Sequence, residues 1–166
     1  KISDFISKEI NISNSKPIKR AALLCKVDLL TGMVGEFPEL QGIMGGYYSF
    51  NEGKDVSDLI KSHYLPKGSS GELSRMIGAN VISLSDKIDH LVGFFIIGKL
   101  PSGSKDPFGL RRSALSVIRI LIEGNILINL DSLIEFTSIQ INKKSNDNQK
   151  IKSFILDRYK VLLREK

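Results

Sequence analysis

The chain has 166 residues, of which 42% are hydrophobic, and its 24 Lys and Arg outnumber its 18 Asp and Glu, giving a formal net charge of +6. This length suits a single domain that buries enough surface to fold without disulfides. The single cysteine, Cys25, excludes an intrachain disulfide and fits a reducing compartment. No apolar run reaches the roughly 18 residues of a membrane span, and no export signal is visible. We expect a cytoplasmic protein without a membrane partner, and a start at Lys1 suggests a piece of a longer polypeptide.

The first expected elements are a short amphipathic helix over residues 2–12 and a central helix over residues 17–34. In the central helix, apolar residues recur at the helical period and predict the side that faces the core: Leu23, Val27, Leu30 and Val34. Its opposite side carries small or acidic residues: Cys25, Asp28, Gly32 and Glu36. Because such a helix packs on both sides, the acid Asp28 needs a partner or a wet cleft.

A glycine-rich segment follows, and we expect a helix over residues 38–50 although glycine costs about 1 kcal/mol relative to alanine in a helix. Its glycines are Gly42, Gly45 and Gly46. Either another helix or a ligand approaches them closely, or the helix is frayed, and the sequence favours neither explanation. A helix over residues 55–63 and a loop over residues 66–71 come next.

The clearest periodicity predicts a helix over residues 77–97, with its apolar side formed by Ile77, Val81, Leu84, Ile88, Leu91 and Phe95. A loop then delivers Asp106 as the N-cap and Pro107 as the first residue of a helix through Glu123. Helices over residues 131–141 and 151–164 complete an all-α bundle of about seven to eight helices. Residues 1–142 are the predicted helical domain, and residues 143–166 are a polar linker and helix leading to the next region.

Positive charge concentrates in two segments. Residues 143–166 hold eight basic residues against three acids, and residues 99–119 hold five against one. The five are Lys99, Lys105, Arg111, Arg112 and Arg119. Such clusters attract polyanions, with nucleic acid as the first candidate, although most charge runs are solvated faces.

Arg111 falls inside the apolar arc of its helix, which favours a carboxylate partner, either Asp86 or Asp28. Arg112 and Arg119 are expected to face outward.

Other chemical motifs are weaker. The spacing of Asp86, Asp89 and His90 could present two ligands to a metal, but the chain has only one other histidine and no paired cysteines, so we expect no metal site.

Cys25 lacks an assigned base and is expected to be a core residue. Residues 102–106, SGSKD, resemble a phosphate cradle ahead of a helix, with an ordinary capped helix start as the commoner alternative.

Two blocks resemble the β subunit of bacterial tetrameric glycyl-tRNA synthetase: CKVDLLTGMVGEFPELQGIMGGYY and SLSDKIDHLVGFFIIGKLPSGSKDPFGLRRSALSVIRIL. In that family the α subunit forms glycyl-adenylate from glycine and ATP, and the β subunit supplies tRNA-binding domains. The resemblance implies an internal domain with an HD-like helical bundle, related to metal phosphohydrolases. It also implies an α subunit and tRNA(Gly) as partners, with no cofactor in this piece because ATP is used at the α subunit.

The comparison with HD enzymes implies a degenerate site. Such enzymes carry a His-Asp pair after a segment similar to residues 21–24, where this chain has Cys25 and Lys26. Their last ligand, an aspartate, corresponds to Asp86. Because two metal ligands are missing, we expect no catalytic residue and no metal. Instead, we expect a structural ion network, in which Lys26 or Arg111 takes the electrostatic place of the metal: Lys26, Asp28, Asp86 and Arg111.

The resemblance therefore predicts a noncatalytic domain of glycine–tRNA ligase that helps to position tRNA through its phosphates. The candidate contacts are Lys99, Lys105, Arg112 and Arg119. Two alternatives are a structural spacer that docks the α subunit through residues 42–46, and a vestigial phosphohydrolase.

Overall fold

A computed structural model describes residues 1–68, 71–141 and 147–164. Within these ranges the chain forms nine α-helices and three short 3-10 helices, without a β-strand, which confirms the all-α prediction. The elements are α1 (Ile2–Glu9), α2 (Lys16–Leu24), η1 (Val27–Leu30), α3 (Gly32–Glu36), η2 (Pro38–Leu40), α4 (Ile43–Tyr48), η3 (Phe50–Glu52), α5 (Lys54–Ser62), α6 (Ile77–Ile96), α7 (Leu110–Glu123), α8 (Leu130–Gln140) and α9 (Asn148–Arg164).

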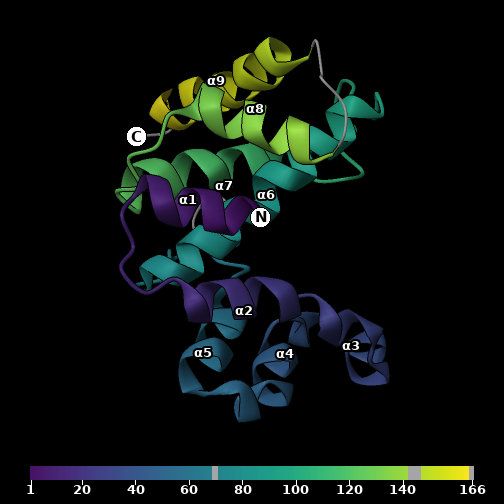
Figure 1. Cartoon of the computed structure of the whole chain (residues 1–166). Coiled ribbons are helices and arrows are strands. Elements are labelled where there is room, and N and C mark those ends of the chain that lie inside the picture. Colours follow the sequence, from purple (N-terminus) through teal and green to yellow (C-terminus); the bar gives the residue numbers. More distant parts are fainter. Residues whose placement is uncertain (69–70, 142–146, 165–166) are drawn as a thin grey trace.

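Helix α6 lies at the centre of the bundle. Figure 1 shows α2, α3, α4 and α5 grouped at one end of the molecule and α1, α7, α8 and α9 at the other, with α6 between them. The predicted core side of α6 is buried from Val81 to Phe95, whereas Ile77 is 45% exposed. Ala79, on the opposite side, is also fully buried because helices cover α6 on both sides. The predicted helix is confirmed within one residue at its end.

The predicted central helix over residues 17–34 is wrong as a single element. The chain leaves helical geometry after Leu24, continues as η1 and then forms α3. Of the four residues predicted to face the core, only Val34 is buried, and Leu30 is 87% exposed. Asp28, by contrast, is 1% exposed. The break turns this acid inward, whereas the apolar side chains that gave the helical pattern lie on the surface.

The glycine-rich segment is also broken, at Gly42, which has a φ of +80°. The structure supports close approach as the reason for its glycines. A Cβ on Gly45 would lie 2.9 Å from Ile60 Cγ2 and 3.0 Å from Asp28 Oδ2, and a Cβ on Gly46 would overlap the Lys61 side chain. The chain itself therefore fills the space beside these glycines, which explains them without a docked partner.

Helix α7 starts at Leu110, three residues later than predicted. The N-cap is Gly109 and not Asp106, so this part of the prediction is wrong. The Asp106 carboxylate still accepts hydrogen bonds from the first backbone N–H groups of the helix, those of Leu110 (2.8 Å) and Arg111 (3.0 Å). These donors are the ones that a phosphate cradle would use. The segment is therefore an ordinary capped helix start.

Helix α9 packs against α7 and α8 and places Ile151 and Ile155 in the core. The predicted boundary near residue 142 lies outside the described residues. No helix in the described part of the chain is both long enough and apolar enough to cross a membrane.

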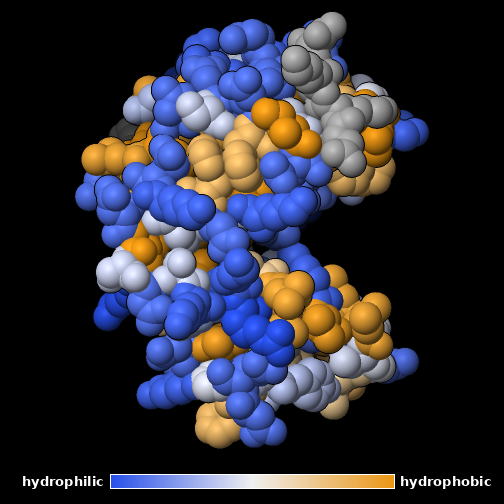
Figure 2. Space-filling view, viewed as in Figure 1, coloured by the Kyte–Doolittle hydropathy of each residue, from blue (hydrophilic) through white to orange (hydrophobic). Residues whose placement is uncertain are grey.

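Part of the surface is apolar. Figure 2 shows apolar side chains gathered at the end of α2 and along η1 and α3. They belong to residues that are each at least two-fifths exposed: Leu23, Val27, Leu29, Leu30, Met33 and Phe37. The same view shows the surface hollowed between the two ends of the molecule.

Candidate functional site

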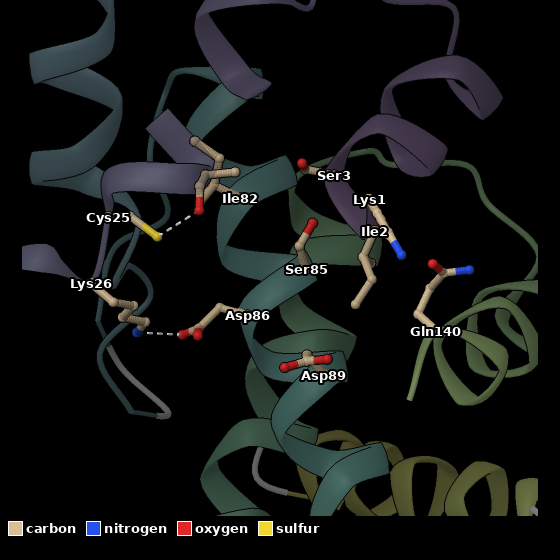
Figure 3. A pocket seen from close by; sticks show the side chains of 11 residues that line it. Lys1, Ile2, Ser3, Cys25, Lys26, Ile82, Ser85, Asp86, Asp89 and Gln140 are labelled. Carbon is tan, nitrogen blue, oxygen red and sulfur yellow. Dashed lines mark hydrogen bonds and ion pairs between the residues drawn. The ribbon is translucent and has the colours of Figure 1, made fainter. Parts of the chain in front are cut away.

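An ion pair between Lys26 and Asp86 links the end of α2 to the central helix α6. Because α2 ends at Leu24, Lys26 turns toward α6, and its Nζ lies 2.9 Å from Asp86 Oδ2 (Figure 3). The same ammonium lies 4.1 Å from the centre of the Tyr64 ring, within cation–π distance. The structure thus brings together two of the four residues predicted as an ion network.

The pair separates two hollows. The α2–α6 hollow, about 420 Å³, includes Cys25, Ser85 and Asp89 (Figure 3). The α6–α7 hollow, about 750 Å³, lies between the loop that follows α5, the middle of α6 and the start of α7. Lys26 and Asp86 line both.

Protonation states in the α2–α6 hollow do not favour catalysis. Burial raises the pKa of the Cys25 thiol to about 11, so it stays protonated near neutral pH and is a poor nucleophile. Burial acts to lower the pKa of Lys26, but the charge of Asp86 and its hydrogen bond outweigh burial and raise this pKa above its ordinary value. Lys26 therefore stays protonated near neutral pH.

Asp28 and Arg111 do not join this pair, contrary to the prediction. Asp28 Oδ2 accepts hydrogen bonds from the N–H groups of Gly42 (2.6 Å) and Gly45 (3.1 Å). Arg111 donates from Nη2 to the Gly103 carbonyl at 2.6 Å. The prediction for Arg111 was wrong because α7 begins at Leu110 and not at Pro107. Arg111 therefore lies in the first turn of the helix, beside the preceding loop, and not in the second turn.

The spacing of Asp86, Asp89 and His90 does not create a metal site. Asp89 faces the α2–α6 hollow, whereas His90 lines the α6–α7 hollow and lies 2.9 Å, through Nε2, from the Phe108 carbonyl. Within the described ranges no group of three or more His, Cys, Asp or Glu residues could hold a metal ion.

The predicted phosphate contacts fall into two groups. Lys99, Lys105 and Arg112 are exposed, and none of their side chains has a hydrogen-bond or ion-pair partner in the described part of the chain. Arg119 is 7% exposed and donates to the Gly71 carbonyl (2.7 Å) and to Glu123 (2.7 Å). The prediction that Arg119 faces outward is wrong, because α7 packs against the loop after α5 on this side.

Sequence reasoning missed two lysines. Lys67 and Lys87 both line the α6–α7 hollow beside Arg112. They are 20 residues apart and belong to neither basic segment. No sequence pattern groups these two lysines. They come together because the loop after α5 folds against α6.

His63 makes the stability of the bundle depend on pH. It is fully buried, its Nδ1 lies 2.6 Å from the Ile60 carbonyl, and burial lowers its pKa from 6.5 to about 4. Between these values the unfolded chain binds a proton that the folded chain does not, so stability falls as the pH drops from 6.5 to 4. We expect this histidine to account for a loss of about 3 kcal/mol in the free energy of unfolding across this window.

Urea denaturation of the wild type and of His63→Phe at a series of pH values measures this contribution. The difference in unfolding free energy between the two proteins should change across the window and stay constant above pH 6.5. His90→Gln, which changes a partly exposed histidine, serves as the control. A difference that does not vary with pH would contradict the assignment.

Comparison with known proteins gives one consistent result. The family model described as glycyl-tRNA synthetase beta subunit matches residues 1–166. The chain is 43% identical over 155 residues to the glycine–tRNA ligase beta subunit of Acidithiobacillus ferrooxidans, covering 89% of this chain and 22% of that protein. It is 49% identical over 151 residues to the same subunit of Rickettsia canadensis, covering 89% of this chain and 22% of that protein. The chain thus spans about a fifth of the length of these relatives.

Proposed function

The chain belongs to the glycyl-tRNA synthetase β-subunit family, and from this premise we propose that it is a noncatalytic part of glycine–tRNA ligase that helps to position tRNA(Gly). In this proposal the complete enzyme joins glycine to tRNA(Gly) with ATP, in the cytoplasm. The adenylate chemistry belongs to an α subunit, and the helical bundle needs no cofactor of its own.

The observation that carries the proposal is the set of three unpartnered cations. Lys99 and Lys105 stand on the loop after α6, and Arg112 stands on the first turn of α7. Because neither a carboxylate nor a carbonyl of the described residues occupies them, they are available for phosphate oxygens. Phosphate contacts of this kind position a nucleic acid without reading its sequence.

The α2–α6 hollow supports a noncatalytic role. It has a protonated thiol at Cys25 and an ammonium at Lys26 that is tied to Asp86. Neither group can activate water or hold a divalent cation as the His-Asp pair of an HD enzyme would. The vestigial phosphohydrolase alternative therefore has no observation in its favour.

Charge reversal at the loop tests the positioning role. We expect Lys99→Glu/Lys105→Glu to weaken binding of a tRNA(Gly) acceptor-stem minihelix by about tenfold or more at low salt. The slope of log Kd against log salt concentration should also become shallower, by the amount that corresponds to the loss of about two phosphate contacts. Fluorescence anisotropy at two or more salt concentrations measures both quantities.

The matched control is Lys16→Glu/Lys54→Glu, which changes the net charge equally at exposed lysines at the start of α2 and α5. If both double variants lose the same affinity, the loop has no specific role and only the net charge matters. If the wild type does not bind at low salt, the positioning role is wrong.

A second candidate function, docking of the α subunit, is favoured by the exposed apolar surface of η1 and α3, where Leu30 is 87% exposed. Exposed apolar patches of this kind often mark protein interfaces. Absence of RNA binding, together with co-elution of the chain with the α subunit, would favour this function.

A further inference from the structure

The α6–α7 hollow combines features that neither basic segment of the sequence contains. It is lined by four cations and two carboxylates: Lys26, Lys67, Lys87, Arg112, Glu39 and Asp86. The Lys26–Asp86 pair neutralises one charge of each sign at 2.9 Å. The other charged side chains are three cations and one carboxylate, the exposed Glu39. The hollow is large enough for a nucleotide.

The three remaining cations have no partners in the described ranges. The side chains of Lys67, Lys87 and Arg112 form no hydrogen bond or ion pair there. Lys87 is half-buried, and burial followed by the nearby Lys26 lowers its pKa, although Asp86 acts in the opposite direction. A half-buried ammonium without a direct ion-pair contact is unfavourable, and an anion in the hollow would offset this cost.

Hydrogen bonds from Arg119 hold one wall of the hollow in place. Arg119 donates to the carbonyls of Gly68 (3.3 Å) and Gly71 (2.7 Å) and so fixes the loop that carries Lys67. At the start of α7, the Arg112 guanidinium lies over Gly109, whose φ is +66°, and Nη2 is 3.0 Å from the position of a Cβ on that glycine. The backbone next to Lys67 is therefore held by hydrogen bonds to α7.

Phe108 is among the residues that line the hollow. Phe108 is 42% exposed, its ring centre lies 4.4 Å from that of Phe94, and its carbonyl lies 2.9 Å from His90 Nε2. An exposed ring beside a group of cations is the usual combination in sites for unpaired RNA, where a base stacks on the ring and its phosphate meets the cations.

We propose that the α6–α7 hollow binds one unpaired nucleotide of an RNA strand, with its phosphate on Lys67, Lys87 and Arg112 and its base against Phe108. This site rests on the proposed function for its source of RNA, but Lys67, Lys87 and Phe108 are additional to the loop contacts. The phosphate of a free nucleotide has the same chemistry, and the test below separates these two sources.

The test uses the polypeptide at its natural length and a fluorescent unpaired RNA of about eight nucleotides. We expect Lys67→Ala/Lys87→Met to weaken binding of this RNA by about tenfold or more. The slope of log Kd against log salt concentration should fall by the amount that corresponds to about two phosphate contacts. Phe108→Leu should weaken binding of the unpaired RNA by about tenfold and leave binding of a duplex of equal length unchanged. The control Lys16→Ala/Lys54→Met also removes two positive charges, and it should weaken RNA binding by less than about twofold.

Each outcome bears on the proposal. Lys67→Arg/Lys87→Arg keeps both positive charges, so it should bind the RNA almost as tightly as the wild type does. Equal affinity of the lysine-deficient variant and its control would overturn the site. Competition by AMP that depends on Lys67 and Lys87, without any effect of these residues on RNA binding, would assign the hollow to a free nucleotide and overturn the RNA assignment.

The two proposals fail in different ways. If Lys99→Glu/Lys105→Glu weakens minihelix binding and the lysine-deficient hollow does not change RNA binding, only the hollow is wrong. If the hollow variants weaken binding and the loop variants do not, only the loop contacts are wrong.

Discussion

Replacement of Asp28 by alanine is expected to lower the free energy of unfolding by about 3 kcal/mol. The side chain is 1% exposed, and its Oδ2 accepts hydrogen bonds from Gly42 at 2.6 Å and from Gly45 at 3.1 Å. A hydrogen bond to a charged group contributes about 1.5–3 kcal/mol, and its loss leaves two backbone N–H groups without this acceptor. Urea denaturation monitored by circular dichroism measures the change.

Three further variants separate the hydrogen bonds from packing. Asp28→Asn keeps the shape and one acceptor oxygen, so a smaller loss is expected. Gly45→Ala should be strongly destabilising, because its Cβ would lie 2.9 Å from Ile60 Cγ2, whereas Gly32→Ala has nothing within 4 Å and should be nearly neutral. If Asp28→Ala were as stable as the wild type, Asp28 would not hold η1 against α4.

Replacement of Arg119 by methionine is expected to lower the free energy of unfolding by about 2–3 kcal/mol. The guanidinium is almost fully buried and donates to two carbonyls of the loop after α5 and to Glu123. Methionine keeps most of the apolar stem and removes these donors, so the loss reports on the polar contacts. Thermal and urea denaturation measure it.

The matched control is Arg112→Met, on the same helix. Arg112 is exposed and has no partner in the described part of the chain, so its replacement should change stability by less than about 0.5 kcal/mol while weakening RNA binding. Equal stability of the two variants would show that the Arg119 contacts contribute nothing. An Arg119 variant that retains stability and loses only RNA binding would restore this residue as a phosphate contact.

The later helices were predictable because their sequence pattern and their packing agree. Along α6 the apolar period continues for five turns, and the bundle buries that side as expected. Asp106 followed by Pro107 predicted a capped start of α7; the N-cap position is Gly109, but the Asp106 carboxylate accepts hydrogen bonds from the first N–H groups of the helix. Capping depends on neighbouring residues, so a single sequence is enough to find it.

The first half of the chain was less predictable because local pattern and tertiary packing disagree there. The apolar repeat that ends with Val34 fits a helix, but a continuous helix would not let Asp28 reach the N–H groups of Gly42 and Gly45. The hydrogen bonds to one oxygen of this buried carboxylate, Oδ2, require the break, and the apolar side chains Val27 and Leu30 are left on the surface.

The sequence by itself determined the helical class, the course of α6, the capped start of α7 and the family, since these depend on periodicity and on residues close together in the chain. Only the tertiary structure decided which charged groups are free. It selected Lys26 rather than Arg111 as the partner of Asp86, buried Arg119 under the loop after α5, and gathered Lys67, Lys87 and Arg112 around one hollow. Coulombic and hydrogen-bond interactions act over a few ångströms in space regardless of separation along the chain, so the partner of a charge is a property of the fold.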